Sequence, residues 1–93
     1  MVRETKGEYY LKIESQLSEI ERKFLLIKSR MKGMSLELQL FYVSEIDQLR
    51  RKLLKAKKEL QKLSDSSHYT WIELRFDLEE IVEDLDKTLK SMY

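Results

Sequence analysis

The apolar residues of this chain, with Thr88 as the one polar exception, fall into three runs in which the spacing alternates between three and four residues. This spacing places apolar side chains on one narrow face of a helix, which is typical of helices that pack side by side. Each run spans three heptads, so we expect three helical segments of similar length. The runs are Tyr10, Ile13, Leu17, Ile20, Phe24, Ile27 and Met31; Tyr42, Ile46, Leu49, Leu53, Ala56, Leu60 and Leu63; and Trp71, Leu74, Leu78, Ile81, Leu85, Thr88 and Met92.

The composition agrees with a helical protein. Of the 93 residues, 38% are charged, with 18 basic and 17 acidic side chains, and none is proline. Chains rich in leucine, lysine and glutamate with this periodicity form coiled coils or long helices. The length suits one small domain. We therefore predict a single all-α domain over residues 1–93, built as an antiparallel coiled coil or three-helix bundle.

A short polar connection separates the second and third runs. Serine, aspartate and threonine cluster between residues 64 and 70, and these side chains compete with helical hydrogen bonding. Thr70 and Glu73 fit the T-x-x-E capping box that begins a helix, and Ser67 is a second candidate cap. This pattern predicts a C-terminal helix over about 71–92 that folds back on the preceding helix as an antiparallel hairpin.

The two helices of this hairpin carry opposite charges. Residues 50–62 contain seven basic side chains and one acid, whereas residues 73–86 contain seven acids and one basic side chain. We interpret these stretches mainly as faces that select each other as neighbours. Because each exposed ion pair contributes only about 0.2–1 kcal/mol, burial of the apolar faces must supply most of the stability.

The middle of the chain has two interpretations. Gly33 suits a left-handed helix C-terminus, with basic residues before it and Ser35 as a candidate cap for a following helix. Alternatively, the apolar face continues as Met31, Met34, Leu38 and Tyr42, an eleven-residue step that carries the face through an unbroken helix. The second interpretation, which we favour, predicts a long helix over about 8–63 with a possible break at Gly33.

A continuous helix prevents the first run from packing on the second within one chain. It therefore predicts an antiparallel, domain-swapped homodimer with its two-fold axis near residue 36 or 37. Apolar residues are unusually dense beside that axis, so we expect them to form the dimer interface. These residues are Met34, Leu36, Leu38, Leu40, Phe41, Tyr42 and Val43. A turn at Gly33 would instead give a compact three-helix monomer.

No pattern of catalytic, cofactor-binding or metal-binding residues is apparent. The chain has no cysteine and a single histidine, His68, whereas a zinc site usually takes three or four ligands. We therefore expect a non-catalytic structural or protein-interaction protein without cofactor or metal. The first residues lack the apolar stretch of a signal peptide and no segment is long enough to span a membrane, so we expect a cytoplasmic protein.

The basic stretch offers one alternative function. On a helix, Arg50, Arg51, Lys55 and Lys58 could contact the phosphates of a nucleic acid or another polyanion. However, no aromatic residues are interleaved with them and the net charge of the chain is only +1, so we regard nucleic acid as the less favoured partner.

The chain resembles a family of small bacterial coiled-coil proteins with no assigned activity, whose pattern is EY…K…QL, a long charged helix and S-x-x-x-W-x-E-L. The resemblance covers most of the chain and implies a non-catalytic helical protein, stress-associated in some relatives. Where that family has an alanine-rich middle and Ser-Gly before the last helix, this chain has MSLELQLFYV and SDSSHYT. The matching residues are Glu8, Tyr9, Lys12, Gln16, Leu17 and Glu19; Tyr42, Ile46, Leu49, Arg50, Lys52, Leu53, Ala56, Lys57, Glu59, Leu60 and Leu63; and Ser67, Trp71, Glu73 and Leu74.

Overall fold

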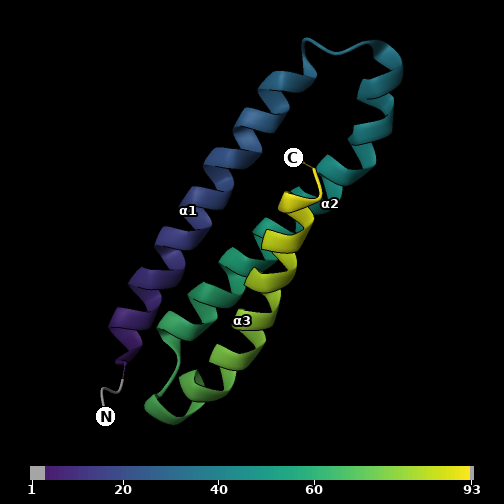
Figure 1. Ribbon diagram of the computed structural model, residues 1–93. Helices are drawn as coiled ribbons and strands as arrows, with labels where there is room; N and C mark the ends of the chain where they lie inside the picture. The colour runs from purple at the N-terminus through teal and green to yellow at the C-terminus, as the bar shows by residue number, and fades with distance from the viewer. Residues whose placement is uncertain (1–3, 93) are drawn as a thin grey trace.

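Three antiparallel helices make up the structure, a computed structural model that describes residues 4–92 (Figure 1). Helix α1 spans Lys6–Met31, α2 spans Leu36–Asp65 and α3 spans His68–Lys90. The bundle is elongated, with extents of 51 × 19 × 18 Å. Within the described residues there is no strand, so the predicted all-α bundle is confirmed.

The core follows the predicted apolar faces closely. Buried residues recur every three or four residues along α1 and along α2 from Leu49 onward, and mostly every seven along α3, as the three-and-four spacing predicts. Tyr9 rather than Tyr10 is fully buried, and Leu89 joins the core beside the half-buried Thr88. Other predicted positions are half-buried rather than buried: Met31, Tyr42, Ile46, Leu74, Ile81 and Met92. The buried residues are Tyr9, Ile13, Leu17, Ile20, Phe24 and Ile27; Leu49, Leu53, Ala56, Leu60 and Leu63; and Trp71, Leu78, Leu85 and Leu89.

The predicted long helix over about 8–63 is wrong in this structure. The first helix ends at Met31, the second begins at Leu36, and the chain reverses between them (Figure 1). Ser35 caps α2, and its side chain accepts a hydrogen bond from the Leu38 amide. The reversal lets α1 pack on α2 and α3 of the same chain, so the apolar faces of the three helices meet without a second chain.

Gly33 is not the left-handed cap that its sequence position suggested. No residue between 4 and 92 has a positive φ, and the cap residue of α1, Lys32, is right-handed helical. A Cβ atom at Gly33 would meet only the Arg30 carbonyl oxygen, at an ordinary 3.7 Å. The turn therefore does not depend on the conformational freedom of glycine.

The connection between α2 and α3 consists of Ser66 and Ser67. Ser67 caps α3, and its hydroxyl accepts a hydrogen bond from the Thr70 amide. The helix consequently begins at His68, so the capping box at Thr70 was the wrong choice and the second candidate, Ser67, was right. The brevity of this connection forces α2 and α3 into the predicted antiparallel hairpin.

Candidate functional site

The free end of the α1–α2 hairpin carries the largest group of exposed apolar side chains on one short segment. We call residues Leu36, Leu38, Leu40, Phe41 and Val43 the apolar tip. Their side chains project from several sides of the first two turns of α2, and a helix that is apolar all round is normally buried. Their exposed fractions are 72%, 50%, 67%, 67% and 53%, respectively.

The apolar tip is exposed because α3 is too short to reach it. Near the end of α3, Thr88 accepts a hydrogen bond from Lys52 of α2, at 2.8 Å. Because the two helices are antiparallel and α3 ends at Lys90, the earlier turns of α2 extend past it (Figure 1). Accordingly, no residue from 28 to 48 is buried. The bundle thus has three helices at one end and two at the other.

The sequence-predicted interface residues all lie at this end, but they differ in their exposure to solvent. Met34 and Tyr42 are half-buried against the hairpin, whereas the five residues of the apolar tip are exposed. The Phe41 and Tyr42 rings meet edge to face, with centroids 5.3 Å apart. In the turn, the Gln39 side-chain amide donates a hydrogen bond to the Met34 carbonyl at 3.1 Å, which holds the first turn of α2 against the turn.

Charged residues of both signs surround the apolar tip. The end of α1 contributes the exposed Lys28 and Arg30, and Lys32 follows directly after it; α2 contributes Glu37 in its first turn and the half-buried Glu45 further along. Positive charge at a helix C-terminus and negative charge at an N-terminus are each favourable to the helix dipole. The apolar tip therefore lies beside charged residues of both signs.

The predicted polyanion contacts lie on α2, at positions that α1 and α3 leave exposed. Arg50, Arg51, Lys55 and Lys58 are all solvent-exposed. The two arginines form ion pairs with Asp47, at 2.8 and 3.0 Å. Across the described residues, the only ion pair between α2 and α3 joins Lys52 to Asp84, at 3.1 Å. Most of the basic stretch therefore does not pair with the acidic helix, although the sequence interpretation expected such pairing.

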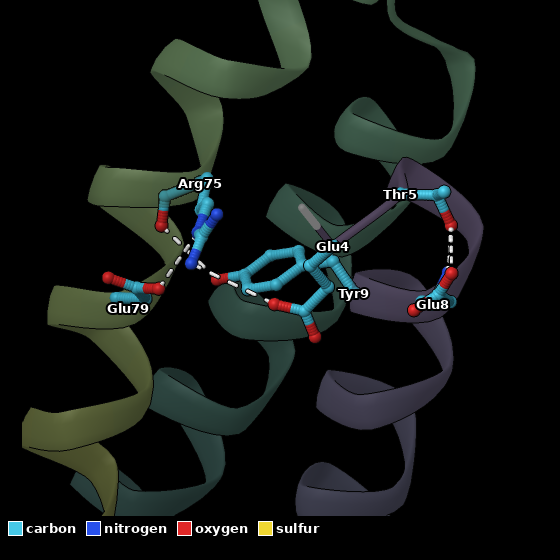
Figure 2. Close-up of polar contacts among 6 residues, drawn as sticks. All are labelled: Glu4, Thr5, Glu8, Tyr9, Arg75 and Glu79. Atoms are coloured by element: carbon cyan, nitrogen blue, oxygen red, sulfur yellow. Dashed lines mark hydrogen bonds and ion pairs between the residues drawn. The ribbon is translucent and has the colours of Figure 1, made fainter. Parts of the chain in front are cut away.

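The opposite end of the bundle is closed by a polar cluster around Tyr9 (Figure 2). The Tyr9 hydroxyl donates to the Arg75 carbonyl at 3.3 Å, and the Arg75 guanidinium lies 5.1 Å from the Tyr9 ring centroid. Arg75 also pairs with Glu79 at 3.1 Å and with Glu4 at 3.8 Å. Burial, with smaller contributions from nearby charges, raises the pKa of Tyr9 to about 12.

Two further contacts attach the start of α1 to this end. The Lys6 ammonium donates hydrogen bonds to the Ser64 and Ser66 carbonyls, at 2.9 and 2.7 Å, where the end of α2 leaves them unpaired. The Tyr9 and Trp71 rings lie 6.0 Å apart. Sequence reasoning assigned Trp71 to the core correctly but missed the Tyr9 cluster, since only the spacing of four from Tyr9 to Ile13 indicates that face.

A groove of about 660 Å³ runs between α1 and α3. Ile13, Ile20 and Val82 form its apolar lining, and acids of α3 form one rim. Those acids are engaged on their own helix: Glu83 pairs with Lys87, and Asp86 with Lys90. The acidic rim of the groove is therefore already paired within α3.

The remaining candidate chemistry is sparse. His68 is exposed at the start of α3, with its ring 5.6 Å from that of Tyr69. Across residues 4–92, no group of three or more His, Cys, Asp or Glu side chains is arranged to hold a metal ion. Within the same part of the chain, no helix combines the length and apolar character needed to cross a membrane.

Comparison with protein-family models, with curated proteins and with solved structures found no match to this chain. The resemblance to small bacterial coiled-coil proteins therefore stays a prediction from the residues quoted above. The apolar tip is the feature of the structure from which a function is best argued.

Proposed function

We propose that this is a non-catalytic interaction protein whose contact surface is the apolar tip, and that its occupant is a second copy of the same chain. The observation that carries this proposal is the exposure of five large apolar side chains on one eight-residue stretch of α2. Contiguous exposed apolar surface of several hundred Å² marks interaction sites in soluble proteins.

The size of the apolar tip supports a second copy as the occupant. An exposed leucine or aromatic side chain presents on the order of 200 Å², so the five partly exposed side chains present roughly 600 Å². Because these side chains point to several sides of α2, two copies meeting through this surface would bury at most about 1,200 Å², which is the lower limit for a specific interface. A two-fold contact uses the same patch twice, so no other surface of the chain is required.

The charges around the apolar tip support the same occupant. Beside each tip lie three basic residues, Lys28, Arg30 and Lys32, and two acidic residues, Glu37 and Glu45. Because both signs are present beside the same surface, a two-fold contact can pair basic residues of one copy with acidic residues of the other. Such complementarity favours the self-contact.

Sedimentation equilibrium of the wild type and of Phe41→Gln tests this proposal. Phe41 is 67% exposed, so the change leaves the fold of one chain intact while removing apolar surface from both halves of the interface. A loss of about 1–2 kcal/mol per copy raises the dissociation constant of the dimer at least tenfold.

Phe76→Gln is the matched control, because Phe76 has the same exposed fraction of 67% but lies on α3. The dissociation constant of the Phe76→Gln dimer should equal that of the wild type. A wild type that sediments as a monomer at several hundred micromolar, or equal weakening by both variants, would refute the proposal.

Binding of a polyanion is the second candidate function. It is supported by the exposure of Lys55 and Lys58, which form no ion pair within the described residues, beside Arg50 and Arg51. A mobility-shift titration with duplex DNA at two salt concentrations tests it, because phosphate contacts produce a steep salt dependence. Absence of binding at low salt would eliminate this candidate.

A further inference from the structure

We propose that the two copies associate by exchanging α1. In this arrangement, the turn at residues 32–35 straightens, α1 and α2 become one helix, and α1 packs on α2 and α3 of the other copy. The inference rests on the self-association proposed above and specifies its geometry. It is argued from the backbone of the turn, the contacts of α1 and the position of the apolar tip.

Hydrogen bonding of the helical type extends from α1 into the turn. The amides of Lys32, Gly33 and Met34 each donate to the carbonyl three residues earlier, at 3.3, 3.1 and 3.0 Å, so helix-type hydrogen bonding continues through Met34. Extended backbone then appears at Ser35, with φ of −62° and ψ of 157°. Since this φ is already helical, rotation about ψ is the main change that Ser35 needs to continue the helix.

A second copy can replace the packing that α1 gives up when the hairpin opens. Within one chain, α1 is held to the other helices by its buried face and by pairs such as Glu21 with Lys57, at 3.0 Å. The same residues of another copy offer the same surface, so each interaction can form again between chains, as in any domain exchange. Straightening also pairs the free amides and carbonyls that flank the turn with one another.

Exchange places the apolar tip where it can be covered. The joined helix, residues 6–65, would be about 90 Å long at about 1.5 Å per residue. The two long helices run antiparallel and cross close to residue 36 or 37, which lies at the start of the apolar tip. Leu36 to Val43 then lie along the neighbouring long helix, whereas in the hairpin they extend past the end of α3.

A spin-label distance within one chain tests the exchange. Ser18→Cys with Lys58→Cys gives two exposed label sites in a chain that has no cysteine of its own. In the hairpin, Ser18 lines the same shallow groove as Lys57, so the labels lie within about 25 Å, given packed axes about 8–10 Å apart. In the joined helix, 40 residues separate them by about 60 Å.

The sample is refolded with an excess of unlabelled chain, so that only distances within one chain are measured. A dimer with the distance near 60 Å supports exchange. A dimer with the short distance refutes exchange and leaves the proposed self-association standing. A monomer at every concentration refutes both.

Changes in the turn give an independent test through the dissociation constant of the dimer. Ser35→Ala removes the cap of α2, which exists only in the hairpin, so it favours the exchanged dimer about fivefold per chain and on the order of 30-fold for two chains. Ser67→Ala is the matched control, because this cap of α3 is the same in both forms. Its dissociation constant should equal that of the wild type.

Insertion of Gly-Asn-Gly after Gly33 provides the opposite perturbation. The longer connection keeps the hairpin and prevents a continuous helix, so the variant should be monomeric where the wild type is dimeric. An insertion variant that still forms the dimer, or a Ser35→Ala dimer no tighter than that of Ser67→Ala, would overturn the exchange.

Discussion

Replacement of Tyr9 by phenylalanine should lower the stability of the protein near neutral pH but raise it, relative to the wild type, at high pH. Near neutral pH, Tyr9→Phe removes the bond from the hydroxyl to the Arg75 carbonyl and keeps the ring in the core. The expected loss is about 1 kcal/mol of the free energy of unfolding.

At high pH the same hydroxyl destabilises the folded state. Burial, supported by Glu79 and Glu4 and opposed by Arg75, raises the pKa of Tyr9 from 10.0 to about 12. The folded protein therefore holds this proton more tightly than the unfolded chain. The contribution of Tyr9 is complete below pH 10 and is lost as the pH rises towards 12, where the loss amounts to about 2 kcal/mol.

The free energies of unfolding of the two proteins, plotted against pH, should therefore cross at about pH 11, above which Tyr9→Phe is the more stable. Urea unfolding followed by circular dichroism, repeated from pH 8 to 11.5, measures the difference in the free energy of unfolding between the two proteins. Subtracting one stability curve from the other removes the pH dependence that the two proteins share. Tyr69→Phe is the control, because Tyr69 is 82% exposed and its replacement should change stability by less than about 0.5 kcal/mol throughout. A difference between wild type and Tyr9→Phe that stays constant with pH would refute the reasoning.

Two further substitutions test how the bundle is held together. Lys6→Met removes the ammonium that caps the carbonyls at the end of α2 and should lower the free energy of unfolding by about 1–2 kcal/mol, whereas Lys55→Met, at an exposed position, should change it little. Leu85→Ala opens a cavity at a fully buried position and should lower it by about 2–5 kcal/mol, against less than about 0.5 kcal/mol for the 52%-exposed Leu54→Ala. Chemical denaturation of the two variants in each pair measures these losses. Equal losses within either pair would contradict the assigned contacts.

The alternation of three and four was sufficient to predict the helices and most of the core, because burial on a helix follows its period. Its failure at the start of α1 is instructive. Tyr10 and Tyr9 lie three and four residues before Ile13, so both fit the pattern. Only the packing of α3, which brings Trp71 and Arg75 to this end, selects Tyr9 for the core.

The turn was harder to predict, because its signals are small compared with the continuity of the apolar face. Helix-type hydrogen bonds run on through Met34 and no residue of the turn has a positive φ, so the sequence carries neither a proline nor a required glycine there. Ser35 and the basic residues before Gly33 were the correct local signals, and Ser35 lacks the glutamate or glutamine of a capping box.

The apolar tip was predicted as an interface but not as an exposed end. Residues 36–43 are visibly rich in apolar side chains, yet whether they are covered depends on how far α3 extends along α2. That distance is set by the helix boundaries at Ser67 and Lys90 together, and local sequence signals place each boundary only to within several residues.

The short third helix also divides the molecule into regions of unequal local stability. At the closed end, opening α1 would separate it from two helices and expose residues such as Tyr9 and Ile13, which are almost completely buried. Towards the turn, the same helix contacts only α2, and the last buried residue of α1 is Ile27. The free energy of local opening must therefore fall along the long axis, so that the hairpin opens from the apolar tip at a small fraction of the global cost.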